Sequence, residues 1–220
     1  MTKNLNNKLI SQLSPFLPEK SAEQVVDWLI EYKVHLKIAK PRKSKLGDYR
    51  PPFNGKGHRI SVNGDLNPYA FLVTFTHEVA HLITYNEYQR KVKPHGREWK
   101  GNYGHLMVKH LKKEVFPTDL EQALTIHLRN PAASSCVDPN LIKVLRAYDS
   151  PQKKAIGLVT VDEIKEEGYF QFPNDRRLFK KGRLMRSRYQ CLEVNSGKQF
   201  AVNKMAEVFK VEIKDNLNFK

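Results

Sequence analysis

The stretch from Phe71 to Thr84 constrains this chain more than any other, because it contains the motif His-Glu-x-x-His. On a helix, residues four apart lie on the same face, so His77 and His81 can direct their imidazoles at one metal ion. Glu78 follows the first histidine and would stand beside the metal, where it could accept a proton from a bound water. Zinc suits such a site, since it takes nitrogen ligands in a tetrahedral arrangement and can keep one position open.

The sequence around the motif predicts a buried helix. Asn67 followed by Pro68 is typical of a helix N-cap and first helical residue, and neither Gly nor Pro occurs again before Tyr85. Apolar residues lie nearly all round this segment, which indicates burial. Two histidines and a glutamate on such a helix need partners, because burying them alone is costly. A metal ion meets that need; the alternative is two core histidines bonded to backbone carbonyls and a glutamate paired with a lysine.

A third ligand must come from further along the chain, since a hydrolytic zinc site usually has three protein ligands. The longer metzincin motif fails here, because its glycine and third histidine positions hold Thr84 and Glu87. The downstream candidates are His95, Glu98, His105 and His110. His95 lies between a proline and a glycine, in a turn that can aim it back at the first helix. For the last two histidines, ordinary surface or core packing is the simpler interpretation.

These features together resemble a known family. The H-E-x-x-H helix, a short spacer and the segment His95–Lys100 (HGREWK) resemble the SprT-like, or Spartan-type, zinc metallopeptidase domain. Upstream, Arg42–Arg50 is similar to the basic, glycine-containing segment before the family's second strand, and Ile60–Asn63 is similar to that strand. The resemblance covers residues 21–111. It implies that one Zn²⁺ ion is bound by His77, His81 and His95, and that Glu78 is the catalytic base.

The net charge of +15 is spread over the chain but is locally dense in two places. Lys33–Arg59 contains nine Lys and Arg residues with Asp48 as its single acid, and Arg176–Arg188 contains seven and no acid. Such surfaces attract polyanions, nucleic acid first among them; the alternative is a solvated basic face without a particular partner. The predicted nucleic-acid contacts are Arg42, Lys43, Lys45, Arg50, Arg183, Arg186 and Arg188.

The order of patterns predicts an α+β fold with two domains. Residues 1–149 are interpreted as a SprT-like, zincin-like metallopeptidase domain, whose H-E-x-x-H helix lies beside a small sheet with strands at 34–38 and 59–63. The second of these strands is expected to offer an edge that holds the substrate backbone. After a linker at 150–157, residues 158–215 are interpreted as a small β-rich module. It resembles the zinc ribbon of some family members but lacks the metal-binding cysteine pairs.

Several local patterns predict the remaining boundaries. Ser21–Gln24 and Thr118–Glu121 have the composition of capping boxes at helix starts. Residues 40–58 are expected to form a basic loop, Arg183–Val194 a single strand-like segment and Asn195–Gly197 a hairpin turn.

Composition also bounds the compartment and the function. No apolar run reaches the length of a membrane span, and the first residues lack the apolar core of a signal peptide. The two cysteines, Cys136 and Cys191, are interpreted as reduced thiols of a cytoplasmic protein; the alternative is a disulfide between them. The resemblance implies a zinc endopeptidase acting on DNA-bound or DNA-crosslinked proteins, as in DNA–protein crosslink repair. The alternative is a nucleic-acid-binding regulator that keeps a zincin fold, with structural zinc and little or no peptidase activity.

Overall fold

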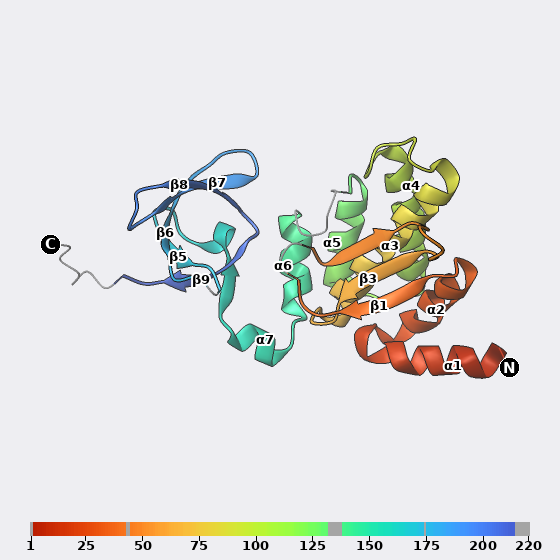
Figure 1. The fold of residues 1–220 in the computed structure, drawn as a ribbon. Coiled ribbons are helices and arrows are strands. Elements are labelled where there is room, and N and C mark those ends of the chain that lie inside the picture. Colours follow the sequence, from red (N-terminus) through yellow and green to blue (C-terminus); the bar gives the residue numbers. More distant parts are fainter. Residues whose placement is uncertain (1, 43–44, 132–137, 174, 214–220) are drawn as a thin grey trace. The chain divides into compact units, whose positions relative to one another are not determined.

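The computed structural model describes residues 2–42, 45–131, 138–173 and 175–213, and it has an α+β composition (Figure 1). The chain divides into two compact units, Met1–Asp149 and Ser150–Lys220. The interpretation of these units as a metallopeptidase domain and a ribbon-like module stays a prediction. Within the described ranges, no helix combines the length and the hydropathy that a membrane crossing requires.

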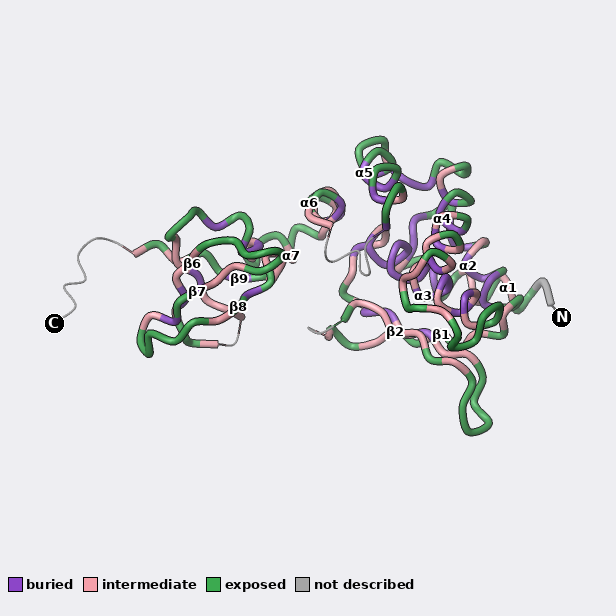
Figure 2. The backbone as a smooth tube through the Cα atoms, turned by 90° about the horizontal axis from the view of Figure 1, so that it is seen from above, coloured by how far each residue is buried: buried purple, intermediate pink, exposed green. Residues whose placement is uncertain are grey.

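The first unit is built around a long buried helix. Its helical elements are α1 (Thr2–Leu13), η1 (Ser14–Phe16), η2 (Glu19–Ser21), α2 (Ala22–Glu31), α3 (Pro68–Tyr88), α4 (Arg97–Lys112), α5 (Thr118–Leu128) and α6 (Pro139–Ala147). In Figure 2, most of α3 is coloured as buried, as are parts of the helices around it.

Helix α3 confirms the predicted buried helix. The Asn67 side chain accepts a hydrogen bond from the backbone N–H of Ala70 at 3.0 Å, and Pro68 occupies the first helical position. The helix continues past the expected end near Tyr85 to Tyr88, and stops at Gln89, whose φ is 55°. Its apolar residues are buried on nearly every side, so it forms the centre of the core.

A three-stranded sheet lies against α3 and corrects two predictions. Its strands are β1 (His35–Ala39), β2 (Gly47–Arg50) and β3 (Arg59–Asn63), in the order β1-β3-β2. β3 pairs with β1 in parallel and with β2 in antiparallel orientation. The expectation of a loop throughout 40–58 was wrong, since β2 lies within it. The expectation that β3 offers a free edge was also wrong, because β3 is the central strand and β2 is at the edge.

Neither predicted capping box forms. The Ser21 hydroxyl donates to the Pro18 carbonyl at 2.7 Å inside a 3₁₀ turn and caps no helix. Helix α5 already includes Thr118, and its N-cap is Pro117, which has no side chain able to cap. In both places a proline with extended ψ sets the start of the helical segment: Ser21 stands at the N-cap of α2 but its hydroxyl bonds within the 3₁₀ turn after Pro18, and Thr118 is already the first residue of α5.

The second unit is mainly an antiparallel sheet. Its elements are α7 (Pro151–Ala155), β4 (Leu158–Thr160), η4 (Val161–Glu163), β5 (Tyr169–Gln171), β6 (Leu178–Leu184), β7 (Arg188–Glu193), β8 (Gln199–Asn203) and β9 (Glu207–Val211). The strand order is β4-β9-β5-β6-β7-β8. Phe170, Phe179, Cys191 and Val208 belong to its separate core.

Three sequence expectations for this unit can be compared with its structure. The predicted linker contains α7, which is capped by the Ser150 hydroxyl oxygen accepting from Lys153 N–H at 3.2 Å. The segment Arg183–Val194 is split between β6 and β7, which pair as a hairpin. The turn at Asn195–Gly197 is confirmed between β7 and β8. Cys191 is a buried free thiol, and Cys136 lies outside the described residues.

Candidate metal centre

Three histidine side chains converge in the first unit. His77 and His81 lie one helical turn apart on α3, and His95 precedes α4. Their Nε2 atoms are 3.2 Å apart for His77–His81, 2.9 Å for His81–His95 and 3.2 Å for His77–His95. Two nitrogens bound tetrahedrally to one zinc ion would be about 3.3 Å apart, given zinc–nitrogen bonds of about 2.0–2.1 Å. The triangle is therefore compatible with a single metal ion.

The turn before α4 places His95. His95 has a φ of 58°, in the left-handed region, and the backbone N–H of Gly96 donates to the Lys93 carbonyl at 3.0 Å. A side chain at position 96 would meet that carbonyl at 2.9 Å, so the turn favours glycine there. The tight turn directs the His95 side chain toward α3. The other candidates for the third ligand do not belong to the cluster formed by the three histidines.

Burial keeps the three imidazoles neutral. Desolvation, with smaller contributions from the neighbouring histidines, lowers the pKa of His77 to about 3 and the pKa of His81 to about 4. Desolvation also lowers the pKa of His95. A metal binds the neutral form of histidine. The three side chains are thus in the protonation state that a metal ligand requires at neutral pH.

Two aromatic rings of α4 support the triad. Trp99 is fully buried, and its ring centroid lies 4.6 Å from that of His77, 5.4 Å from His81 and 4.7 Å from His95. Trp99 in turn stacks on Tyr103, with centroids 5.1 Å apart and planes 10° apart. Their spacing of four residues on one helix is the signal in the sequence for a shared face. The rings restrict the orientations that the three imidazoles can adopt.

A buried histidine–carboxylate pair lies behind Tyr103. His127 on α5 forms a hydrogen bond through Nδ1 with Asp138 Oδ2 at 2.8 Å. Its ring centroid lies 6.1 Å from that of Tyr103. The sequence contained no local signal for this pair, because α5 and the α6 cap are brought together only by packing. Tyr103 and Arg97 are near enough in sequence to the triad to be possible donors to an oxyanion; Tyr103 is buried, whereas the Arg97 side chain is 95 % exposed.

Glu78 lies against the edge strand of the sheet. A side chain at Gly47 on β2 would meet Glu78 Oε1 at 2.5 Å, so this glycine leaves the room that the carboxylate occupies. Burial, with a smaller contribution from Asp48, raises the pKa of Glu78 to about 8, although a hydrogen bond from the Tyr49 backbone N–H acts in the opposite direction. Without a cation nearby the carboxyl would be largely protonated at neutral pH. A metal ion held by the three imidazoles would favour the ionised form, which a general base requires.

The predicted nucleic-acid contacts differ in how they are used within the fold. Arg42 is half-buried and bonds the β3 side chains of Asn63 at 2.8 Å and Ser61 at 3.0 Å. Lys45 and Arg50 both pair with Asp48, at 2.7 and 2.8 Å, and remain exposed.

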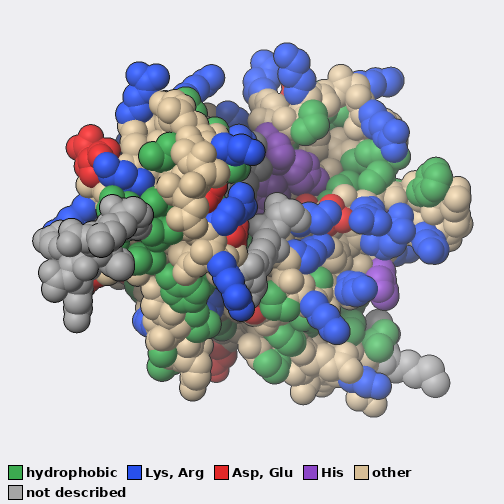
Figure 3. Space-filling model, turned by 60° about the vertical axis from the view of Figure 1, so that its left-hand side comes forward, with side chains coloured by type: hydrophobic (Ala, Val, Ile, Leu, Met, Phe, Trp, Pro, Cys, Tyr) green, Lys and Arg blue, Asp and Glu red, His purple; other side chains and the backbone are tan. Residues whose placement is uncertain are grey.

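In the second unit, Arg183 donates to Gln190 at 3.0 Å, and Arg183, Arg186 and Arg188 are all exposed. Lys43 lies outside the described residues. Figure 3 shows histidine side chains at the surface with Lys and Arg side chains in the same view.

Comparison with known proteins gives one short match. Over 36 residues the chain is 64 % identical to "Protein SprT" of Vibrio parahaemolyticus serotype O3:K6 (strain RIMD 2210633), which covers 16 % of this chain and 21 % of that protein. No family model matches the chain, and no solved structure matches it. The match suggests a SprT-like relationship over a limited segment.

His110, one of the alternative ligands, is a core residue that predicts a pH effect on stability. It is fully buried, meets the Trp28 ring at 5.1 Å and has no described hydrogen-bond partner at Nδ1. Burial lowers its pKa to about 4. The unfolded chain binds this proton near pH 6.5, so the folded state loses stability as pH falls below that value. At pH 4 the loss from this one group is on the order of 3 kcal/mol.

The measurement is urea unfolding of the metal-free protein at several pH values between 7 and 4. We expect His110→Leu to lose less stability over this range than the parent does. The matched control is His105→Leu, because His105 is exposed on the same helix and should leave the parent's pH dependence unchanged. Equal pH dependence in the parent and His110→Leu would contradict the prediction.

Proposed function

We propose that this chain is a zinc-dependent endopeptidase of the SprT-like, zincin type. The observation that carries the proposal is the triangle of Nε2 atoms from His77, His81 and His95, with Glu78 next to the first ligand on the same buried helix. Three neutral imidazoles and one nearby carboxylate form the donor set of a hydrolytic zinc site. The short similarity to SprT supports the same reading.

In the proposed mechanism, the protein positions both reactants and moves one proton. Bound zinc would polarise the peptide carbonyl and lower the pKa of a water from 15.7 toward about 7. Glu78 accepts the proton of the attacking water and passes it to the leaving amine. The Trp99 ring keeps the three imidazoles oriented. An extended substrate paired with the free edge of β2 would pass beside Glu78, because Gly47 of that strand borders the carboxylate.

The proposed substrates are proteins bound or crosslinked to DNA. The net charge of +15 and the exposed cations of both units favour a large polyanion over a small neutral amide. An endopeptidase with little side-chain selectivity can still choose its targets when DNA holds enzyme and substrate together at high local concentration. Nucleic acid is therefore proposed as a partner, in addition to protein substrates.

The test is cleavage of a basic DNA-binding protein by the zinc-loaded chain, with and without single-stranded DNA. We expect cleavage that DNA stimulates. Glu78→Gln should lower the rate by about 10²- to 10⁴-fold, the usual contribution of a general base, while zinc content and fold stay unchanged. If Glu78→Gln lost zinc, its lower rate could not be assigned to the missing general base alone.

A different result would favour the other class of function. If no lane shows cleavage although zinc is bound and DNA is retained, the chain is better described as a nucleic-acid-binding regulator with structural zinc. The basic surface supports that alternative without reference to Glu78, because the exposed cations do not depend on peptide hydrolysis.

A further inference from the structure

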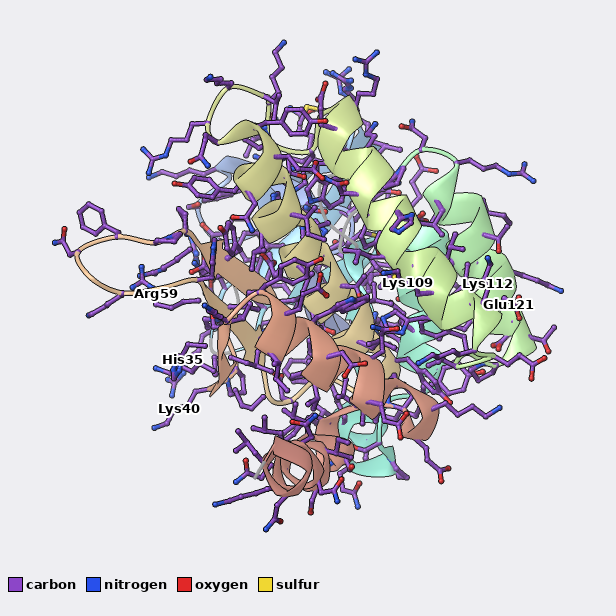
Figure 4. All side chains as sticks on the ribbon, turned by 90° about the vertical axis from the view of Figure 1, so that its right-hand side faces the viewer. His35, Lys40, Arg59, Lys109, Lys112 and Glu121 are labelled. Carbon is purple, nitrogen blue, oxygen red and sulfur yellow. The ribbon has the colours of Figure 1, made fainter. Side chains whose placement is uncertain are left out.

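The segment between β2 and β3 carries an exposed aromatic ring. Phe53 is 67 % exposed, more than any other large apolar side chain that the structure describes. The exposed loop projects beside the sheet in Figure 2, and in Figure 4 it extends outward beside the labelled Arg59. A ring with this exposure contributes little to the core and leaves its face available to a partner.

The loop is held rigidly by its own backbone. Phe53 and Lys56 exchange two backbone hydrogen bonds, at 3.0 and 3.1 Å. The two residues between them, Asn54 and Gly55, have φ values of 48° and 72°, the signature of a type I′ turn.

Both arms of the loop are restrained as well. Pro51 and Pro52 precede the turn and fix its entry. The Arg59 guanidinium donates to the Pro51 carbonyl at 3.3 Å and joins the two arms. The ring of Phe53 is therefore presented to solvent in a preorganised position, which reduces the entropy cost of binding a partner.

The charge around Phe53 identifies the kind of partner. Residues 49–59 contain Arg50, Lys56 and Arg59 and no acidic residue, although Arg50 also pairs with Asp48 on β2 at 2.8 Å. Lys56 is paired with Phe53 across the turn, so a cation and an aromatic ring lie on opposite arms of one hairpin. An aromatic ring among cations is the combination that single-stranded nucleic acid requires: a surface for an unpaired base and charges for the phosphates.

We propose that the loop 51–58 binds single-stranded nucleic acid, with the Phe53 ring stacked on an unpaired base and Arg50 and Lys56 contacting the backbone phosphates. The loop continues directly from β2, the strand that borders Glu78 through Gly47. Nucleic acid bound there would be anchored at the end of the strand that we propose for the protein substrate. The proposal rests on the nucleic-acid part of the proposed function and does not need peptide hydrolysis.

The experiment measures binding of a fluorescently labelled oligothymidine to the full chain by anisotropy. Phe53→Ala should weaken binding about 5- to 150-fold, the range for loss of one base stack, and Phe53→Trp should restore it. Ile126→Ala is the matched control, because Ile126 is 57 % exposed on α5 of the same unit and should leave the affinity unchanged.

Salt dependence separates stacking from charge. Lys56→Ala should reduce the slope of log affinity against log salt by about 1, whereas Phe53→Ala should leave that slope unchanged. Both results together would support the proposed geometry.

Unchanged oligothymidine affinity in Phe53→Ala would overturn the proposal. It would also be overturned if Phe53→Ala weakened binding only to anionic phospholipid vesicles, or only to the protein substrate without DNA. This outcome differs from failure of the proposed peptidase activity. DNA binding that depends on Phe53, without any cleavage, would support the nucleic-acid site and contradict the peptidase proposal.

Discussion

Replacing Gly47 by alanine is expected to abolish peptide hydrolysis although Glu78 and the three histidines all remain in the chain. The added Cβ would lie 2.5 Å from Glu78 Oε1 and 2.8 Å from Thr74 Cγ2, closer than real Cβ contacts allow. Thr74 is buried within α3, so the Glu78 side chain or strand β2 must move. Either movement strains the hydrogen bond from the Tyr49 N–H to Glu78. We expect a rate loss of about 10²- to 10⁴-fold, as for a misplaced general base.

Gly57→Ala is the matched control for this prediction. Position 57 lies between β2 and β3, has room for a Cβ and meets only the Lys33 carbonyl, at 3.9 Å. The measurements are cleavage rate, zinc content and urea unfolding of both variants. Gly47→Ala should keep zinc and lose about 1–3 kcal/mol of stability through overpacking. Parent-level cleavage by Gly47→Ala would show that the carboxylate position seen here is unimportant for the reaction.

The parts of the fold that sequence predicted were those fixed by local interactions. Helix α3 could be predicted because its cap is three residues from its donor and its apolar residues are continuous along the chain. The turn at Asn195–Gly197 is equally local, with Gly197 at a φ of 68°. In contrast, β2 is four residues long and lies among Gly, Pro and basic residues. It is a strand because β3 pairs with it, which no local pattern reports.

The candidate site divides in the same way. His77, Glu78 and His81 share one helix, so their relation follows from helical spacing alone. The sequence left four candidates for the third ligand. In the structure, His95 has a left-handed backbone conformation, and its imidazole lies beside those of His77 and His81. The packing of Trp99 under the triad and the clearance at Gly47 both depend on contacts between separate elements. Such contacts arise from tertiary structure and could not be read from spacing.

Removing the His95 imidazole is expected to remove most of the metal affinity. Without it, only the two ligands from α3 remain, because His95 supplies the third Nε2 atom of the cluster. Changes outside the first coordination shell typically cost 10- to 100-fold in affinity, so loss of a direct ligand should cost more than about 100-fold. In the parent, zinc at 100 times its Kd should raise the free energy of unfolding by about 2.7 kcal/mol. At the same zinc concentration this increment should fall below about 0.4 kcal/mol in His95→Ala.

The backbone at this position calls for a second variant. His95 has a φ of 58°, which alanine tolerates poorly and asparagine tolerates well, so His95→Asn removes the imidazole with less strain on the turn. His105→Ala is the control, because His105 is an exposed histidine further along α4. Zinc titration against a competing chelator, and urea unfolding with and without zinc, measure both quantities. If His95→Asn bound zinc as the parent does, the third ligand would have to be sought elsewhere, beginning with Glu98→Ala, because Glu98 lies in the first turn of the helix that His95 precedes.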